Sequence, residues 1–125
     1  MNKYHNTKTT TSDGITHDSK KEAQRWCELK LLERGGYISN LQRQVEFELI
    51  PNQYETIERY SKSGTRLKDQ VKLVERAVNY VADFCYIENG QMVVEDTKSP
   101  ITQTPAFVIK RKLMLQVHGI KVKII

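Results

Sequence analysis

The sequence predicts an α/β fold whose elements follow one another as helix, three strands, helix, strand. Three observations indicate this order. A helix-capping motif at Ser19 precedes apolar residues at helical spacing, apolar and polar residues alternate over 41–50, and Asn89-Gly90 separates two stretches rich in β-branched residues. A second capping signal at Thr104 then opens the last helix, which a short alternating stretch follows.

Composition indicates one domain with a basic balance. A chain of 125 residues can bury its own core, and 38% hydrophobic with 28% charged residues is ordinary for a globular protein. The net charge of +5 favours an anionic partner, and no apolar run reaches the ~20 residues of a membrane span. Residues 1–13 are polar and aperiodic, so we expect a flexible N-terminal arm, either frayed or lying along a phosphate backbone. Residues 14–125 are expected to form the single domain.

The first helix is expected to begin at Asp18 or Ser19 and to end near Arg34. Ser19-Lys20-Lys21-Glu22 fits a capping box, and Gly35-Gly36 supplies the stop at the C-terminal end. Apolar residues at helical spacing predict the side that packs on the core. That side is expected to consist of Ala23, Trp26, Cys27 and Leu31, with Leu29 and Leu32 on its flanks.

The next element is a strand over residues 41–50. Apolar residues from Leu41 to Leu49 alternate there with glutamine and glutamate, and Pro51 ends the pattern. Residues 52–70 are polar, and Ser61-Lys62-Ser63-Gly64 is their clearest loop. For this stretch we expect strand extensions around a mobile excursion.

Asn89-Gly90 is the strongest short-range signal of a two-residue hairpin turn. The first arm reaches Ile87 and the second runs over 91–98. Such a turn pairs residues whose numbers sum to 179, which places Asp83 opposite Asp96. Because side chains alternate along a strand, Lys98 shares the face of Asp96 while Glu95 points the other way. Two carboxylates and an ammonium group should therefore converge at the open end of the hairpin.

The last two elements follow Pro100. Thr104-Pro105 is typical of an N-cap followed by proline in the first helical turn, and the helix should close at His118-Gly119. The alternating stretch 120–124 then predicts a final strand, whose lysines would discourage pairing at an open edge.

Paired carboxylates on adjacent strands are a common way to hold Mg²⁺ or Mn²⁺, because hard cations prefer oxygen ligands. Such an ion polarises a phosphoryl oxygen and makes bound water nucleophilic at neutral pH. Lys98 would orient that water or neutralise charge developing on the phosphorus. The alternative is that Asp83 and Asp96 are solvated strand charges, with Lys98 in a surface ion pair.

The cysteines and histidines do not predict a zinc site. Cys27 and Cys85 lie in apolar patterns without a C-x-x-C partner, which indicates buried free thiols. His5, His17 and His118 have no metal-ligand spacing with them.

These motifs together resemble a known superfamily. Asp83 followed by Asp96-Thr97-Lys98, in this order of elements, resembles the PD-(D/E)XK nucleases. More narrowly, four segments resemble a family of small phage proteins, namely Ser19 to Ala23, Ala82-Asp83-Phe84, residues 94–98 and the helix at 110–113. That family is often labelled only as a domain of unknown function and is similar to Holliday junction resolvases. The resemblance covers about residues 14 to 125. It implies a restriction-endonuclease-like core, with a mixed central sheet flanked by helices, in a protein of the bacterial host cytoplasm.

The resemblance also implies residue roles. Asp83 and Asp96 would be metal ligands, the Thr97 backbone carbonyl would complete the shell, and Lys98 would be the catalytic lysine. Glu22 matches a glutamate that many members bring to the same cation, although the capping box explains it equally without metal. His17 stands where the family would have an aromatic residue such as phenylalanine.

Basic, polar and aromatic residues are candidates for contacting nucleic acid. Each has an ordinary alternative, such as a solvated helix face or a packed strand side chain. The candidates are Lys20 and Lys21 at the start of the first helix, Gln44 on the first strand, Lys110 and Lys112 on the second helix, and Tyr54, Tyr60 and Tyr80 for stacking on unpaired bases.

The leading interpretation is a metal-dependent phage DNA endonuclease, selective for branched DNA such as a Holliday junction and acting as a homodimer. One set of Asp83, Asp96 and Lys98 per chain supplies one hydrolytic centre, so paired incisions favour two subunits. A second interpretation is a non-catalytic nucleic-acid-binding module on a nuclease scaffold. A third is a phage protein that binds a host factor, favoured only by the unexplained residues 52–70.

Overall fold

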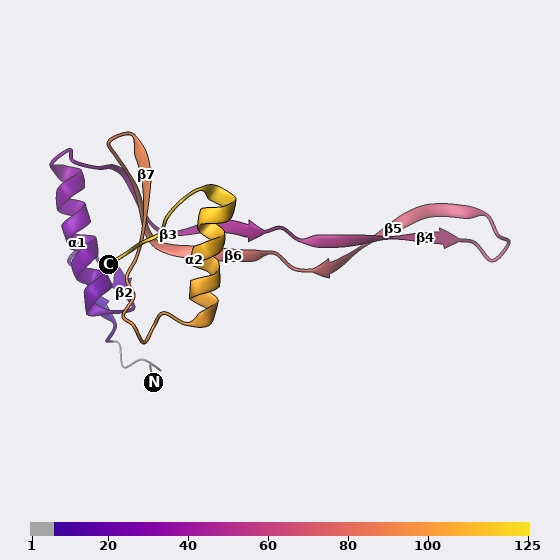
Figure 1. Cartoon of the computed structure of the whole chain (residues 1–125), viewed down its shortest axis with the longest axis horizontal. Helices are drawn as coiled ribbons and strands as arrows, with labels where there is room; N and C mark the ends of the chain where they lie inside the picture. The colour runs from indigo at the N-terminus through magenta and orange to yellow at the C-terminus, as the bar shows by residue number, and fades with distance from the viewer. Residues whose placement is uncertain (1–6) are drawn as a thin grey trace.

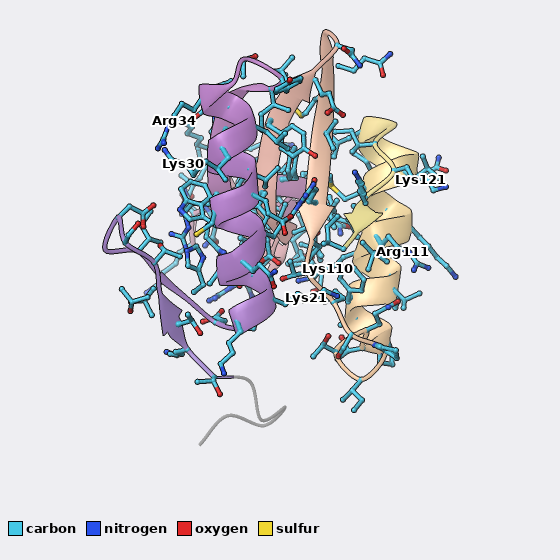
Figure 2. The ribbon with its side chains drawn as sticks, turned by 90° about the vertical axis from the view of Figure 1, so that its left-hand side faces the viewer. Lys21, Lys30, Arg34, Lys110, Arg111 and Lys121 are labelled. Atoms are coloured by element: carbon cyan, nitrogen blue, oxygen red, sulfur yellow. The ribbon has the colours of Figure 1, made fainter. Side chains whose placement is uncertain are left out.

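The computed structural model describes residues 7–125 and has a body of two helices around a sheet, from which a narrow two-stranded arm projects (Figure 1). The sheet has the order β3–β6–β7–β8, and α1 and α2 lie on its opposite sides (Figure 2). Only β7 and β8 are parallel, so the sheet is mixed. The elements of the body are α1 (Lys20–Arg34), β3 (Ser39–Ile50), β6 (Val78–Glu88), β7 (Gln91–Asp96), α2 (Pro105–His118) and β8 (Lys123–Ile124). The expected α/β class and the mixed sheet between helices are confirmed.

α1 begins as its capping motif predicts. The Ser19 hydroxyl accepts a hydrogen bond from the Glu22 backbone N–H at 3.1 Å, and Gly35 caps the other end. The buried side, however, consists of Glu22, Ala23, Trp26 and Leu29. The prediction that Cys27 and Leu31 are buried is wrong, because the helix turns the face around Trp26 and Leu29 onto the sheet, leaving those two side chains in solvent.

The β6–β7 hairpin has the predicted turn and register. Asn89 and Gly90 both have positive φ, at 52° and 76°, as a type I′ turn requires. The ladder contains five predicted pairs, namely Phe84–Glu95, Cys85–Val94, Tyr86–Val93, Ile87–Met92 and Glu88–Gln91. A two-residue turn therefore sets the position of every residue along both arms.

Regular alternation breaks down in β6 beside β3. Ala82 packs in the cluster under α2, whereas Phe84, two residues later, packs with Trp26 under α1. On β3 the residue between the partners of Ala82 and Phe84 is Gln44, whose φ of 54° lies in the left-handed region. The sheet is thus locally distorted where Asp83 lies.

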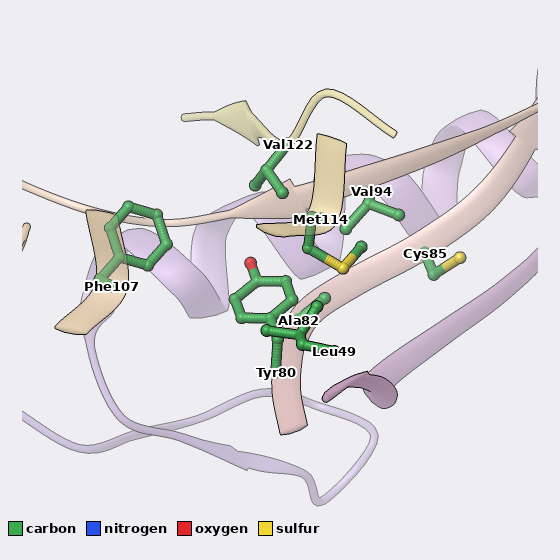
Figure 3. Close-up of a cluster of buried hydrophobic side chains, with 8 residues drawn as sticks. All are labelled: Leu49, Tyr80, Ala82, Cys85, Val94, Phe107, Met114 and Val122. Atoms are coloured by element: carbon green, nitrogen blue, oxygen red, sulfur yellow. The ribbon is translucent and has the colours of Figure 1, made fainter. Parts of the chain in front are cut away.

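Two apolar clusters hold the helices to the sheet. Under α1, Trp26 stacks on Phe84 with 5.9 Å between ring centroids. Under α2, Phe107 and Met114 pack on β6, β7 and the end of β3 (Figure 3). The N-cap predicted for α2 is confirmed, since the Thr104 hydroxyl accepts from the Phe107 N–H at 3.2 Å. The final strand is shorter than predicted, with only Lys123–Ile124 paired to β7.

The strand extensions predicted for residues 52–70 are confirmed, and the predicted loop at Ser61 to Gly64 is the turn between them. β3 ends at Ile50 before Pro51, as predicted, and the chain continues as β4 (Gln53–Tyr60) and β5 (Arg66–Glu75), which pair only with each other. The loop is confined to the few residues between them. At the base, the Asn52 side-chain oxygen accepts from the Ala77 N–H at 2.6 Å and ties the two strands together.

The segment expected to be a flexible arm is partly folded. β1 (Thr9–Thr10) pairs with β2 (Thr16–His17), and Asp13 between them accepts a hydrogen bond from the Trp26 indole at 2.6 Å. Residues 1–6, including Lys3, lie outside the described part of the chain. Within residues 7–125, no helix is long and apolar enough to cross a membrane.

Candidate active site

A pocket of about 310 Å³ lies where the open end of the hairpin meets the first turn of α1. α1 and its N-cap supply acidic and basic side chains, β6 supplies one carboxylate, and the segment after β7 supplies a threonine and a lysine. The start of α2 closes the remaining side. The lining residues are Asp18, Ser19, Lys21, Glu22, Asp83, Thr97, Lys98, Ser99, Thr102, Thr104 and Phe107. Four residues predicted for catalysis or metal binding therefore share one pocket.

Asp83 is held by the residue after β7. One of its carboxylate oxygens, Oδ2, accepts from the Thr97 backbone N–H at 2.8 Å and from the Thr97 hydroxyl at 2.7 Å. The hairpin ladder ends at Phe84 and Glu95, so Asp83 and Asp96 are not a ladder pair. Asp96 pairs instead with Ile124 of β8, and Asp83 lines the pocket.

Asp96 is almost completely buried, with 1% of its surface exposed. Tyr80 donates its hydroxyl proton to Oδ2, while Oδ1 has no hydrogen-bond partner and lies 3.5 Å from the Lys98 ammonium nitrogen. Burial, reinforced by the charge of Asp83, raises the pKa of Asp96 to about 7. Ionisation of this carboxyl group therefore costs free energy unless a further cation lies nearby.

Glu22, in the first turn of α1, is also buried, at 4% exposure, and lines the pocket. Its Oε1 accepts from the Gln44 amide at 3.4 Å and lies 3.6 Å from Nδ1 of His17. Burial and the charges of Asp83 and Asp18 raise the pKa of Glu22 to about 7. Burial lowers the pKa of His17, so the histidine is neutral and the contact is not an ion pair at neutral pH.

The charges of these carboxyl groups fit a divalent cation. Asp83 raises the pKa of both Glu22 and Asp96, which means that negative charge is concentrated between them. A cation would favour ionisation of both groups and supply the partner that Asp96 Oδ1 lacks. No group of three or more histidine, cysteine, aspartate or glutamate side chains within residues 7–125 is spaced to enclose an ion. One or two carboxylates with several waters are, however, a usual coordination of Mg²⁺.

Lys98 lies on the α2 side of the pocket. Its ammonium nitrogen is 5.1 Å from the centre of the Phe107 ring, and the side chain retains 28% exposure. A neighbouring hollow of about 280 Å³ is lined by Asp96, Lys98 and Lys110, so Lys110 approaches the same two residues from α2. Lys98 is therefore placed between the acidic pocket and a second basic residue.

The predicted nucleic-acid-binding residues are only partly brought together. Lys21 lines the acidic pocket and Lys110 the hollow beside it (Figure 2). Lys112 lies on another side of α2, by Lys121 and Ile124, and Lys20 is exposed outside the pocket. Gln44 reaches the site through its bond to Glu22.

Three residues near the site were not predicted to take part in it. Tyr80 was considered for base stacking, but it is buried and donates to Asp96, so stacking is excluded by its position. The sequence predicts Asp18 as a possible helix cap and marks His17 as a departure from the family pattern. In the structure, His17 contacts Glu22, and the charge of Asp18 raises the pKa of Glu22. Their position before the capping box was the available signal, since residues there must lie at the N-terminal end of α1.

Behind the site, Glu95 points to α1 as its position in the strand predicts. It is fully buried and accepts two hydrogen bonds from the Arg25 guanidinium, at 2.8 and 2.7 Å, and one from the Tyr86 hydroxyl. This ion pair joins α1 to β7 and neutralises Glu95.

Comparison with known proteins assigns the chain at the level of a family. No curated protein and no solved structure matches it. One family model matches residues 1–125, the full length of the chain. The match includes the hairpin and the first turn of α1, which together form the pocket. The chain therefore belongs to the family described as "Protein of unknown function (DUF1064)".

Proposed function

We propose that this protein is a metal-dependent DNA endonuclease with a restriction-endonuclease-like core of the PD-(D/E)XK type, active on branched DNA. One observation carries the proposal. Glu22, Asp83, Thr97 and Lys98 line a single pocket, and Asp96 behind it has a buried carboxylate oxygen with no hydrogen-bond partner. Carboxylates that can hold a metal ion, with a lysine beside them, can together support phosphodiester hydrolysis.

The proposed roles follow from these positions. When bound, Mg²⁺ or Mn²⁺ would polarise a phosphoryl oxygen and lower the pKa of an attacking water. Asp83 and Asp96 would hold the ion, with Glu22 and the Thr97 carbonyl oxygen as further donors. Lys98, 3.5 Å from Asp96 and still partly exposed, would contact the scissile phosphate and stabilise negative charge that develops there.

Substrate binding is proposed to involve basic residues around the pocket. Lys21 and Lys110 flank the carboxylates from α1 and α2, and the chain carries a net charge of +5. Neutralisation of backbone phosphates by such lysines supplies affinity without sequence readout. Preference for branched DNA, including Holliday junctions, rests on the motif resemblance, as does a place in the cytoplasm of a bacterial host.

The direct test is cleavage of a labelled four-way junction, flap, linear duplex and single strand, each with Mg²⁺, Mn²⁺ or EDTA. We expect metal-dependent products that are most abundant from the branched substrates. Asp83→Asn should abolish cleavage because it removes a charged ligand at the centre of the carboxyl group cluster. Lys121→Ala, on the far side of α2, is the matched control and should cleave as the wild type does.

Three results would contradict the proposal. Metal-dependent cleavage that survives in Asp83→Asn would show that the activity arises elsewhere. DNA binding without cleavage of any substrate would instead favour the non-catalytic module. Neither binding nor cleavage of any of the four DNA substrates would leave the carboxylates without a role in nucleic-acid chemistry.

A further inference from the structure

The β4–β5 arm exposes both of its faces to solvent. Of the residues in its two strands, only Asp69 is even partly buried, and neither strand pairs with the sheet of the body. Figure 1 shows the arm extending away from both helices. Isolated two-stranded ribbons are marginally stable in water, so a ribbon of this length is expected to gain stability from a partner.

One face of the arm is apolar. Residues opposite one another in a ladder share a face, and here Tyr54 is opposite Leu73 and Thr56 is opposite Val71. We call these four residues the apolar face. Their exposure is large: 60% for Tyr54, 64% for Val71 and 42% for Leu73. The opposite face at the same level carries the pairs Glu55–Lys72 and Ile57–Gln70.

Charge on the arm favours a protein over DNA as its partner. Residues 53–75 contain five basic and four acidic side chains, a net charge of +1 in a chain of net +5. Arg66, toward the outer end of the arm, is paired with Glu58 at 3.5 Å and with Asp69 at 2.9 Å. A surface that tracks phosphates would carry a clear excess of basic over acidic side chains instead. Exposed tyrosine and aliphatic residues with balanced charge are typical of the centre of a protein interface.

We propose that the apolar face of the arm is a homodimer interface, packed against the same face of a second copy. Two-fold assembly brings one patch onto itself, which suits an uncharged patch and avoids repulsion between two basic chains. Residues 53–75 carry only +1 of the chain's net charge of +5, so two copies can approach through the arm with little like-charge repulsion. This inference does not depend on the proposed nuclease activity, because it concerns the arm and not the pocket.

The test measures molar mass by light scattering and sedimentation equilibrium, in the absence of DNA and metal, over a wide range of concentration. Val71→Glu places a carboxylate at the centre of the apolar face, and two-fold symmetry doubles it. Like charges juxtaposed at an interface are strongly unfavourable, so the dimer Kd should rise about a hundredfold or more. Gln70→Glu adds the same charge one residue away on the opposite face and should leave the Kd unchanged.

Val71 is exposed in the single chain, so its replacement should not disturb the monomer. Unchanged Trp26 fluorescence and circular dichroism would verify this, and Tyr54→Glu provides a second variant on the same face. A monomeric wild type, or equal effects of the charges on the two faces, would overturn the proposal. If the wild type is a monomer and DNA affinity falls in both Val71→Glu and Tyr54→Glu, the arm is a nucleic-acid contact, and this result would overturn the dimer proposal as well.

Discussion

Replacing Asp96 with asparagine should stabilise the metal-free protein at alkaline pH. The pKa of Asp96 in the folded chain is raised to about 7, above its usual 3.8, so the folded state binds more protons than the unfolded state between these values. The contribution of Asp96 to the free energy of unfolding is therefore fully present near pH 4 and is lost as the pH rises through 7. An asparagine has nearly the same shape and cannot ionise, so the free energy of unfolding of the Asp96→Asn variant should not decrease in this way as the pH rises.

The magnitude follows from the shift. About three pKa units correspond to about 4 kcal/mol, as an upper limit. Because Asp83 raises the pKa of Glu22 as well as that of Asp96, the repulsion is shared, and we expect about half of the limit, or about 2 kcal/mol, to belong to Asp96 alone. Asp96→Asn should therefore match the wild type near pH 4 and exceed its free energy of unfolding by about 2 kcal/mol at pH 8.

The assay is urea unfolding followed by Trp26 fluorescence, in EDTA, at several values of pH from 4 to 8. Trp26 is the only tryptophan and is buried against Phe84, so its emission reports loss of the core. A difference between the two proteins that does not grow with pH would refute the electrostatic reasoning. With Mg²⁺ present, the wild type should regain stability at pH 8, and the variant should regain less.

Three further substitutions test other parts of the site. Lys98→Ala should abolish cleavage with nearly unchanged DNA affinity in gel shifts, because one contact among several is a small share of binding; equal loss of both would contradict a catalytic role. Glu22→Gln keeps the helix cap, so circular dichroism should be unchanged while turnover at limiting Mg²⁺ falls; unchanged kinetics would leave Glu22 as a cap only. Arg25→Met should lower the free energy of unfolding by about 3–5 kcal/mol, measured in urea, because it leaves Glu95 buried and unpaired; a loss below about 1 kcal/mol would show that Glu95 is otherwise compensated.

Local chemistry explains which parts of the fold the sequence predicts. The start of α1, the Asn89-Gly90 turn and both ends of α2 depend on caps and turn residues within a few positions of one another. The turn also fixes the hairpin register, which places Asp83 and Lys98 in one pocket. For the arm the sequence predicts strand extensions and their loop but neither the length of the strands nor their pairing, because strands exposed on both faces have no alternation between buried and solvated residues.

The rest of the site depends on packing between distant elements. Gln44 meets Glu22 across a distorted part of the sheet, and no pattern in β3 marks the positive φ that accompanies it. Tyr80 finds Asp96 because α2 covers that face of the sheet. Such contacts follow from the relative placement of α1, α2 and the sheet, which neither periodicity nor capping specifies.

The Arg25–Glu95 ion pair gives the two neighbouring carboxylates of β7 different sources of counter-charge. Glu95 is paired with the Arg25 guanidinium as long as α1 packs on the sheet, so its counter-charge comes from the protein itself. Asp96, one residue later and on the other face, has only a partly exposed lysine at 3.5 Å. The response of this strand to pH is therefore one-sided: ionisation of Asp96 affects the face that α2 covers, while the Arg25–Glu95 ion pair continues to hold α1 on the other face.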